Sequence, residues 1–369
     1  MFNEVFTLPY YIAPFHLLIG KYNLGVVSSV IREVRRLSGE NGFGAGGVAI
    51  LAEGLTRNFG GSVAVDGVDL SVAAGEIYGF LGPNGAGKTT TVRMLVTLLS
   101  PSAGRATVAG RDIASDPGGV RLRIGVALQE AALDVRQTGA EILRLQGRLY
   151  GLRRGEIERR MKDLRELIDI GEALDNPVGS YSGGMRRRLD LAAALVHNPE
   201  VLFLDEPTTG LDPVSRSRVW EEVRRLNEEL GVTIFLTTQY LEEADELAGR
   251  VGIIDSGRIV AEGTPEDLKR SVGKDLIIIH TTEPSERAAS VEAMAERLRG
   301  LAAVERVTAQ DGTLTVVTPD GSRTVGRVAV ALEEAGVTVE RLTLRTPTLD
   351  DVFLEVTGNR LRVGEEVPE

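Results

Sequence analysis

Residues 82–90 read Gly-Pro-Asn-Gly-Ala-Gly-Lys-Thr-Thr and match the phosphate-loop pattern G-x-x-x-x-G-K-[ST]. Such a loop brings backbone N–H groups close to phosphate oxygens, and its glycines leave room for that approach. The apolar run 77–81 before the loop is typical of a buried strand, and 89–99 after it has apolar residues at helical spacing. This order of strand, loop and helix predicts a nucleotide phosphate site on an α/β fold.

Each residue of the loop then has an expected part in binding. We expect the Lys88 ammonium to reach the β- and γ-phosphates and the Thr89 hydroxyl to bind Mg²⁺. The helix that begins here would direct the positive end of its dipole at the phosphates. The other candidate ATP contacts in this segment are Gly82, Pro83, Asn84, Gly85, Ala86, Gly87 and Thr90.

A second segment, 201–206, reads Val-Leu-Phe-Leu-Asp-Glu, four apolar residues followed by two carboxylates. A buried strand would carry both acids to the carboxyl edge of the sheet, where open α/β folds bind their ligands. We expect Asp205 to hold Mg²⁺ through water and Glu206 to polarise the water that attacks the γ-phosphate.

With these motifs, residues from about 50 to 265 resemble an ATP-binding-cassette (ABC) ATPase, the nucleotide-binding subunit of a membrane transporter. Gln129 resembles the family's Q-loop glutamine, which contacts Mg²⁺ or water and faces the transmembrane partner. Residues 210–212 resemble the D-loop. Phe59 stands where the family places an aromatic ring against adenine, and a phenyl face is adequate for stacking.

Residues 181–185, Tyr-Ser-Gly-Gly-Met, resemble the family signature LSGGQ, with Tyr and Met at its two ends. Ser182, Gly183 and Gly184 predict a tight turn that enters a helix, which builds a second anion site from a hydroxyl, backbone N–H groups and the helix dipole. In the family this site binds the γ-phosphate held by the opposite subunit. The resemblance therefore implies a homodimer of cassettes joined by ATP.

Gln239 departs from the family pattern, which has His after the strand that follows the D-loop. The glutamine amide still donates a hydrogen bond, but it cannot become an imidazolium. We interpret Gln239 as a working substitute that acts with Glu206 and Lys88 in catalysis; the alternative is a slow or nearly inactive cassette.

The composition of the chain limits its possible domain number, cross-links and partners. The chain has 369 residues, no Cys and a net charge of −11, which predicts more than one domain, excludes disulfides and argues against nucleic acid as the main partner. No run of 18 or more apolar residues is present, so the chain is not expected to span a membrane by itself. A transport role would need a separate integral membrane permease and a peripheral position on the cytoplasmic face of the cell membrane.

The predicted domains are an N-terminal extension and linker (1–47), poorly ordered, an ABC ATPase domain (48–271) and a C-terminal accessory domain (272–369). The extension has the pattern of one amphipathic helix, so the alternative is a membrane-surface or partner-binding helix. The ATPase domain would have a mixed sheet and a helical subdomain at about 130–190. The accessory domain has the pattern β-α-β-β-α-β of a small α+β, ferredoxin-like unit, without a catalytic constellation.

The C-terminal segment 346–355 and the run Gln-Tyr-Leu-Glu-Glu-Ala-Asp at 239–245 resemble drug-exporter cassettes of the daunorubicin/doxorubicin-resistance type. The resemblance implies an exporter of drugs or antibiotics, although nothing in this chain identifies cargo. The alternative is a soluble, non-transport ABC ATPase acting on nucleic acid or the ribosome. Such proteins carry two cassettes or a long coiled coil, and the segment between Lys88 and Ser182 has no sustained heptads.

Overall fold

The computed structural model describes residues 47–128, 133–167, 171–281, 288–310, 313–335 and 337–358. Contacts divide these residues into two compact units, the first ending at Glu262 and the second beginning at Gly263. Our sequence-based boundary at 271/272 instead assigned helix α9 (Pro265–Val272) to the ATPase domain. This helix packs against α12 (Leu349–Thr357) of the second unit. Residues 1–46 of the predicted extension lie outside the described residues.

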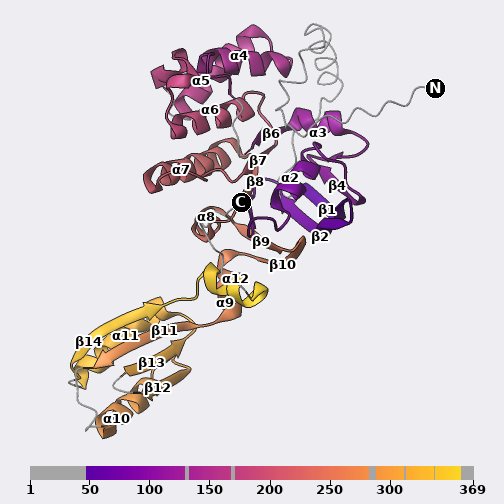
Figure 1. Cartoon of the computed structure of the whole chain (residues 1–369). Coiled ribbons are helices and arrows are strands. Elements are labelled where there is room, and N and C mark those ends of the chain that lie inside the picture. Colours follow the sequence, from indigo (N-terminus) through magenta and orange to yellow (C-terminus); the bar gives the residue numbers. More distant parts are fainter. Residues whose placement is uncertain are drawn as a thin grey trace, which may run out of the picture. The chain divides into compact units, whose positions relative to one another are not determined.

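The first unit is built on a six-stranded sheet of order β10-β9-β3-β8-β7-β6 and a four-stranded sheet of order β2-β1-β4-β5 (Figure 1). The six-stranded sheet consists of β3 (Ile77–Leu81), β6 (Ile124–Ala127), β7 (Val201–Asp205), β8 (Thr233–Thr238), β9 (Arg250–Asp255) and β10 (Arg258–Gly263). The four-stranded sheet consists of β1 (Val48–Phe59), β2 (Ser62–Ala73), β4 (Ala103–Val108) and β5 (Arg111–Asp112). Every residue of β3, β7 and β8 is buried, as expected of parallel strands covered on both faces.

Helices of this unit are α2 (Lys88–Leu95), α3 (Pro117–Arg123), α4 (Gly139–Leu149), α5 (Arg154–Leu167), α6 (Gly183–Leu195), α7 (Pro213–Leu230) and α8 (Leu241–Leu247), with 3-10 turns at Gly171–Asp175 and Val178–Ser180. Helix α4 contacts both α5 and α6, and the three form the helical region in Figure 1. The sequence pattern predicts a helix over 221–230, but α7 begins earlier, at Pro213. Asp212 accepts a hydrogen bond from the Ser215 N–H and Pro213 occupies the first turn, two start signals that apolar spacing alone does not reveal.

Strand register brings the predicted site segments to one edge of the sheet. Strand β3 pairs in parallel with β8, with Leu81 opposite Thr238, and β8 pairs in parallel with β7, with Thr237 opposite Asp205. The phosphate loop, the two carboxylates and Gln239 therefore all follow the carboxyl ends of adjacent strands.

The second unit has the order β11 (Asp275–Thr281), α10 (Ala288–Arg299), β12 (Arg306–Gln310), β13 (Thr313–Thr318), α11 (Gly321–Glu334) and β14 (Val339–Arg345). Its sheet is antiparallel, in the order β12-β13-β11-β14, and alternate strand residues such as Ile277 and Val316 form one core with α10 and α11. This is the predicted β-α-β-β-α-β arrangement. The sequence Asp-Gly at 311–312 predicts the turn of a hairpin, and these two residues lie outside the described residues. Across the described ranges, no helix has the length and apolar character needed to cross a membrane.

Candidate nucleotide site

The phosphate loop leaves no room for side chains at two of its glycines. A carbon added to Gly82 would lie 2.4 Å from the Ile254 carbonyl oxygen, and one added to Gly87 would lie 2.5 Å from the Ala64 carbonyl oxygen. Gly87 also has a φ of +108° and immediately precedes α2. Glycine is therefore required where the chain turns from loop into helix, and the N–H groups of the first turn of α2 remain directed at the loop.

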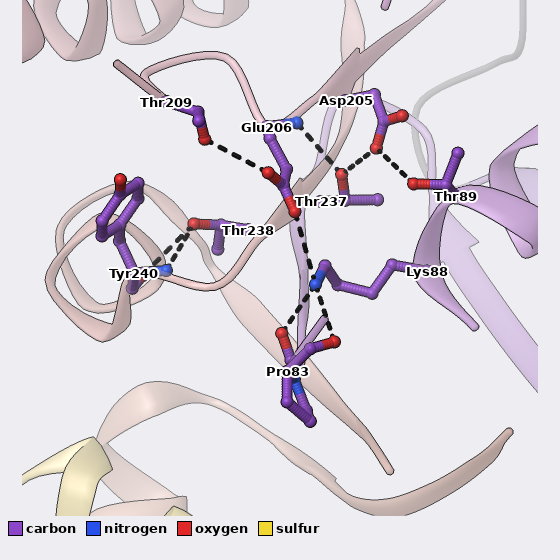
Figure 2. Close-up of polar contacts among 10 residues, drawn as sticks. Pro83, Lys88, Thr89, Asp205, Glu206, Thr209, Thr237, Thr238 and Tyr240 are labelled. Atoms are coloured by element: carbon purple, nitrogen blue, oxygen red, sulfur yellow. Dashed lines mark hydrogen bonds and ion pairs between the residues drawn. The ribbon is translucent and has the colours of Figure 1, made fainter. Parts of the chain in front are cut away.

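Lys88 is buried, with 5% of its surface exposed, and its ammonium faces back into the loop. It donates hydrogen bonds to the carbonyl oxygens of Gly82 at 2.7 Å and Pro83 at 3.0 Å (Figure 2). Its Nζ lies 3.5 Å from Oε1 of Glu206. Burial lowers the pKa of Lys88, while the neighbouring carboxylates of Glu206 and Asp205 oppose that change. The Lys88 ammonium thus contacts both the carbonyl oxygens of the loop and the Glu206 carboxylate.

Asp205 meets two hydroxyl groups at the end of β7. Thr237 donates to its Oδ1 at 2.5 Å and Thr89 donates to the same oxygen at 3.5 Å (Figure 2). A carboxylate and the first hydroxyl of the phosphate-loop helix form the hard oxygen set that Mg²⁺ prefers, usually completed by waters and phosphate oxygens. The residues present therefore fit a Mg²⁺ ion. Thr90, the next residue of α2, is half-buried.

Glu206 has an unusual backbone conformation, with a φ of +47°. Its N–H donates to both the carbonyl oxygen and Oγ1 of Thr237, each at 3.1 Å. Its Oε2 accepts a hydrogen bond from Thr209 at 3.2 Å. A non-glycine residue in the left-handed region is strained, and such strain is typical of functional sites. Neighbouring hydrogen bonds hold the Glu206 carboxylate near the loop.

The signature residues form a helix start, as predicted. Ser182 caps α6, accepting a hydrogen bond on its Oγ from the Met185 N–H at 3.2 Å, and Gly183 and Gly184 form the first turn. Ser182 and Gly183 are exposed. Figure 1 shows α6 among the helices α4 and α5, whereas α2 lies beside the β1–β2–β4 sheet. The signature and the phosphate loop are therefore two separate helix starts within one chain, and a helix start is suited to binding an anion.

The other predicted site residues occupy the borders of the site. Phe59 is the last residue of β1 and is 38% exposed. Gln239 leaves β8 in a turn that is fixed by the hydrogen bond from the Tyr240 N–H to Oγ1 of Thr238, at 2.8 Å. Asn84 and Gly85 are exposed at the loop tip, whereas Ala86 is buried. Gln129 lies outside the described residues.

Arg187 is a buried residue that we did not assign to the site from sequence. Its Nη1 donates to the Leu128 carbonyl oxygen at 2.9 Å and to Oδ2 of Asp190 at 3.1 Å. The signature helix is thereby joined to the residue that follows β6. Burial raises the pKa of Asp190 to about 6, against the opposing effect of Arg187. Arg186 is exposed and Arg188 half-buried, so the arginine triplet is spread over different sides of the helix, as its spacing predicts.

Glu243 is a second buried carboxylate that the sequence did not reveal. Its Oε1 accepts hydrogen bonds from Thr208 at 2.8 Å and from the indole N–H of Trp220 at 3.0 Å. Burial raises the pKa of Glu243, and these hydrogen bonds oppose the rise. The residue connects α8, α7 and the segment after Glu206. An acid in the first turn of an amphipathic helix ordinarily faces solvent, so only tertiary structure could identify it.

Family models match in both units. Residues 65–209 match the family described as ABC transporter, and residues 263–357 match the family described as ATP-binding protein DrrA1-3-like, C-terminal domain. The daunorubicin resistance ATP-binding protein DrrA3 of Streptomyces coeruleorubidus is 47% identical over 317 residues, covering 86% of this chain and 98% of that protein. The daunorubicin/doxorubicin resistance ATP-binding protein DrrA of Streptomyces peucetius is 46% identical, covering 84% and 93%.

Among solved structures, cbiO1 of Clostridium perfringens, described as part of the ABC transporter complex cbiONQ, matches with a TM-score of 0.57 and 26% identity, over 68% of this chain and 99% of that one. The predicted fold class and ATPase class are thus confirmed. The phosphate loop, the paired carboxylates and the signature helix start are the features expected of such a cassette. The chain belongs to the ATP-hydrolysing subunits of ABC transporters, in the group of DrrA-like resistance proteins.

Proposed function

We propose that this ATPase drives the export of a drug or antibiotic through a separate integral membrane permease, at the cytoplasmic face of the membrane. The names of the related resistance proteins support the class of cargo. The match of the C-terminal unit to the DrrA1-3-like family supports assignment to this group rather than to ABC ATPases in general. The permease would receive the conformational signal through the segment that contains Gln129.

The observation that carries the ATP-dependent dimerisation in this proposal is the separation of two helix starts within one chain, each suited to binding an anion. The phosphate loop ends at α2, while Ser182 and Gly183 are exposed at the start of α6. A second copy of the chain would place its Ser182, Gly183 and Gly184 against the γ-phosphate held by the first copy. ATP would then join two cassettes, and hydrolysis would release them.

Each residue at the sheet edge has a chemical role in this cycle. Lys88 would exchange its bonds to the Gly82 and Pro83 carbonyls for bonds to the β- and γ-phosphates. Thr89 and Asp205 would hold Mg²⁺, with Gln129 as a further contact, and the bound ion would neutralise charge on the phosphates. Glu206 would accept the proton of the attacking water, and Gln239 would donate a hydrogen bond to the γ-phosphate.

Static light scattering with ATP and Mg²⁺ tests the dimer, in wild type and in Glu206→Gln. We expect Glu206→Gln to lower phosphate release at least about 100-fold and to accumulate as a dimer with ATP, since removal of the base prevents the step that separates the cassettes. Lys88→Ala is the matched control, and it should stay monomeric with ATP. A strictly monomeric Glu206→Gln protein with full ATPase activity would overturn the mechanism.

Export is tested separately, with the membrane protein encoded by the neighbouring reading frame. A multi-span neighbour, co-expressed with this chain, should co-purify with it and lower daunorubicin accumulation in cells. Glu206→Gln should still co-purify but should not lower accumulation. If co-purification and ATPase activity are retained while accumulation of several drug classes is unchanged, the drug cargo is wrong and the ATPase assignment stands.

A further inference from the structure

The end of the β1–β2 hairpin lies against the phosphate loop. Arg57 of β1 is paired with Val65 of β2. A carbon added to Gly87 of the loop would lie 2.5 Å from the carbonyl oxygen of Ala64 and 3.4 Å from Cγ2 of Val65. Phe59, two residues beyond Arg57, therefore ends a strand whose partner touches the loop. It is 38% exposed there.

Arg57 covers the Phe59 ring and is anchored independently of it. Its Cζ lies 4.6 Å from the centroid of the ring, within the range of a cation–π contact. Its Nη1 donates to the Ser100 carbonyl oxygen at 2.8 Å. The adjoining Asn58 N–H donates to Oγ of Ser102 at 3.1 Å, so the strand end is fixed to the segment that follows α2. Arg57 thus holds a defined position against the ring.

We propose that Arg57 is a positioning residue for the nucleobase: it occupies one face of Phe59 and leaves the opposite face for the base to stack on. The inference rests on the proposed role of Phe59 at the ATP site. An exposed phenyl ring samples several orientations, and binding must then supply the entropy of fixing it. The anchored guanidinium restricts the ring before the nucleotide arrives. Because stacking accepts any base, Arg57 should strengthen binding of ATP and GTP alike.

The expected effect is modest and specific to the base. An exposed cation–π contact contributes about 0.5–1 kcal/mol, so Arg57→Ala should weaken binding of ATP about two- to five-fold. Inorganic tripolyphosphate has the charge of the phosphates but no base, and its affinity should not change. Arg57→Lys keeps a cation and should restore much of the ATP affinity.

A double-mutant cycle separates this role from a structural one. The Kd values of ATP and tripolyphosphate are measured by calorimetry without Mg²⁺ for wild type, Arg57→Ala, Phe59→Ala and the double variant. In the Phe59→Ala background, Arg57→Ala should have no further effect on ATP. Arg105→Ala is the control, since Arg105 is another strand arginine, 75% exposed and paired with Glu53. Circular dichroism melting of each variant checks the fold.

The negative outcomes of this experiment would have different meanings. If the two losses are additive, if tripolyphosphate weakens as much as ATP, or if Arg57→Ala leaves ATP binding unchanged, Arg57 does not act through the ring and the proposal is wrong. If Phe59→Ala leaves the ATP affinity unchanged, the base lies elsewhere and the proposal is also wrong, while the ATPase mechanism stands. Among the outcomes of this binding experiment, only a wild-type chain that binds no ATP would refute the proposed function itself.

Discussion

The ammonium of Lys88 lies 3.5 Å from a carboxylate oxygen of Glu206, and both side chains are buried, 5% and 8% exposed. The cation expected to bind phosphate is therefore paired with the carboxylate expected to act as base. ATP must replace Glu206 beside Lys88, which leaves the carboxylate available for water. This exchange makes nucleotide affinity sensitive to the charge of Glu206.

Glu206→Gln should therefore bind ATP more tightly than wild type, by about five-fold if the competing pair contributes about 1 kcal/mol. The amide keeps the shape of the side chain but neither holds Lys88 as an ion pair nor repels the γ-phosphate. Calorimetric titration with ATP and EDTA measures the affinity without hydrolysis. Glu206→Asp keeps the charge and should stay near the wild-type affinity. Equal affinity of Glu206→Gln and wild type would show that the pair does not compete with ATP.

Local sequence patterns were sufficient to predict the phosphate loop, the strands β3, β7 and β8, and the order of elements in the second unit. Each of these depends on apolar runs, turn residues or caps that are close in sequence. The links from Arg187 to Leu128 and from Glu243 to Trp220 join residues on different elements. Which of these residues meet depends on how the helices pack on the sheet. Apolar periodicity does not encode that packing.

The differences between the predicted borders and those of the structure have the same origin. Helix α9 was assigned to the ATPase domain because it directly follows β10, yet its buried Leu268 lies on a helix that packs against α12, far along the chain. The start of α7 was placed late because residues 213–218 have few apolar side chains, while its capping residue Asp212 carried the signal. Domain boundaries depend on contacts between residues that are far apart in sequence. The start of a helix can depend on a single capping residue.

The raised pKa of Asp190 predicts a pH-dependent stability. Burial raises this pKa from 3.8 to about 6. The folded chain therefore binds this proton more tightly than the unfolded chain, and the contribution of Asp190 to the free energy of unfolding falls as pH rises between about 4 and 6. A shift of about two pKa units corresponds to about 3 kcal/mol over the full range.

Asp190→Asn removes that titration. The free energy of unfolding of wild type minus that of Asp190→Asn should fall by about 1.4 kcal/mol from pH 5 to pH 7.5. Urea unfolding followed by fluorescence of Trp220, the single tryptophan of the chain, reports on the first unit alone. Asp163→Asn on α5, whose side chain is 62% exposed, is the matched surface control. A pH-independent difference for Asp190→Asn would contradict the raised pKa.

The fold should tolerate replacement of the Glu243 carboxylate by an amide, but not removal of the side chain. Glutamine keeps an oxygen to accept the hydrogen bonds from Thr208 and Trp220, and it removes a buried charge, so Glu243→Gln should change the free energy of unfolding by less than about 1 kcal/mol. Glu243→Ala removes the acceptor of the buried Thr208 hydroxyl and of the partly buried Trp220 indole N–H and should cost about 3 kcal/mol. Urea unfolding at pH 8 followed by circular dichroism measures both. Equal losses in the two variants would show that packing volume, not hydrogen bonding, sets the role of Glu243.

Whether a C-terminally truncated chain stays soluble should depend on whether it ends at the boundary between the two units. A chain that ends after Glu262 keeps the hydrogen bond from the Tyr78 hydroxyl to Glu262, at 3.0 Å, and removes all of α9. A chain that ends after Ser271 keeps α9 except for its last residue, lacks α12 and exposes Leu268. We expect the second chain, not the first, to bind a hydrophobic dye and to aggregate on light scattering. Comparable behaviour of the two chains would indicate that α9 is stable without α12.

Gln239→His tests whether the amide is an adequate partner for the γ-phosphate. Gln239 leaves β8 beside Thr237 and Thr238, at the same sheet edge as Glu206, and its amide can donate the hydrogen bond that histidine would supply. We therefore expect Gln239→His to change kcat of ATP hydrolysis by no more than about three-fold, and Gln239→Ala to lower it more than ten-fold, since only alanine removes the donor. Steady-state phosphate release at saturating ATP measures all three. A gain of 100-fold or more in Gln239→His would instead identify the wild-type chain as a slow cassette.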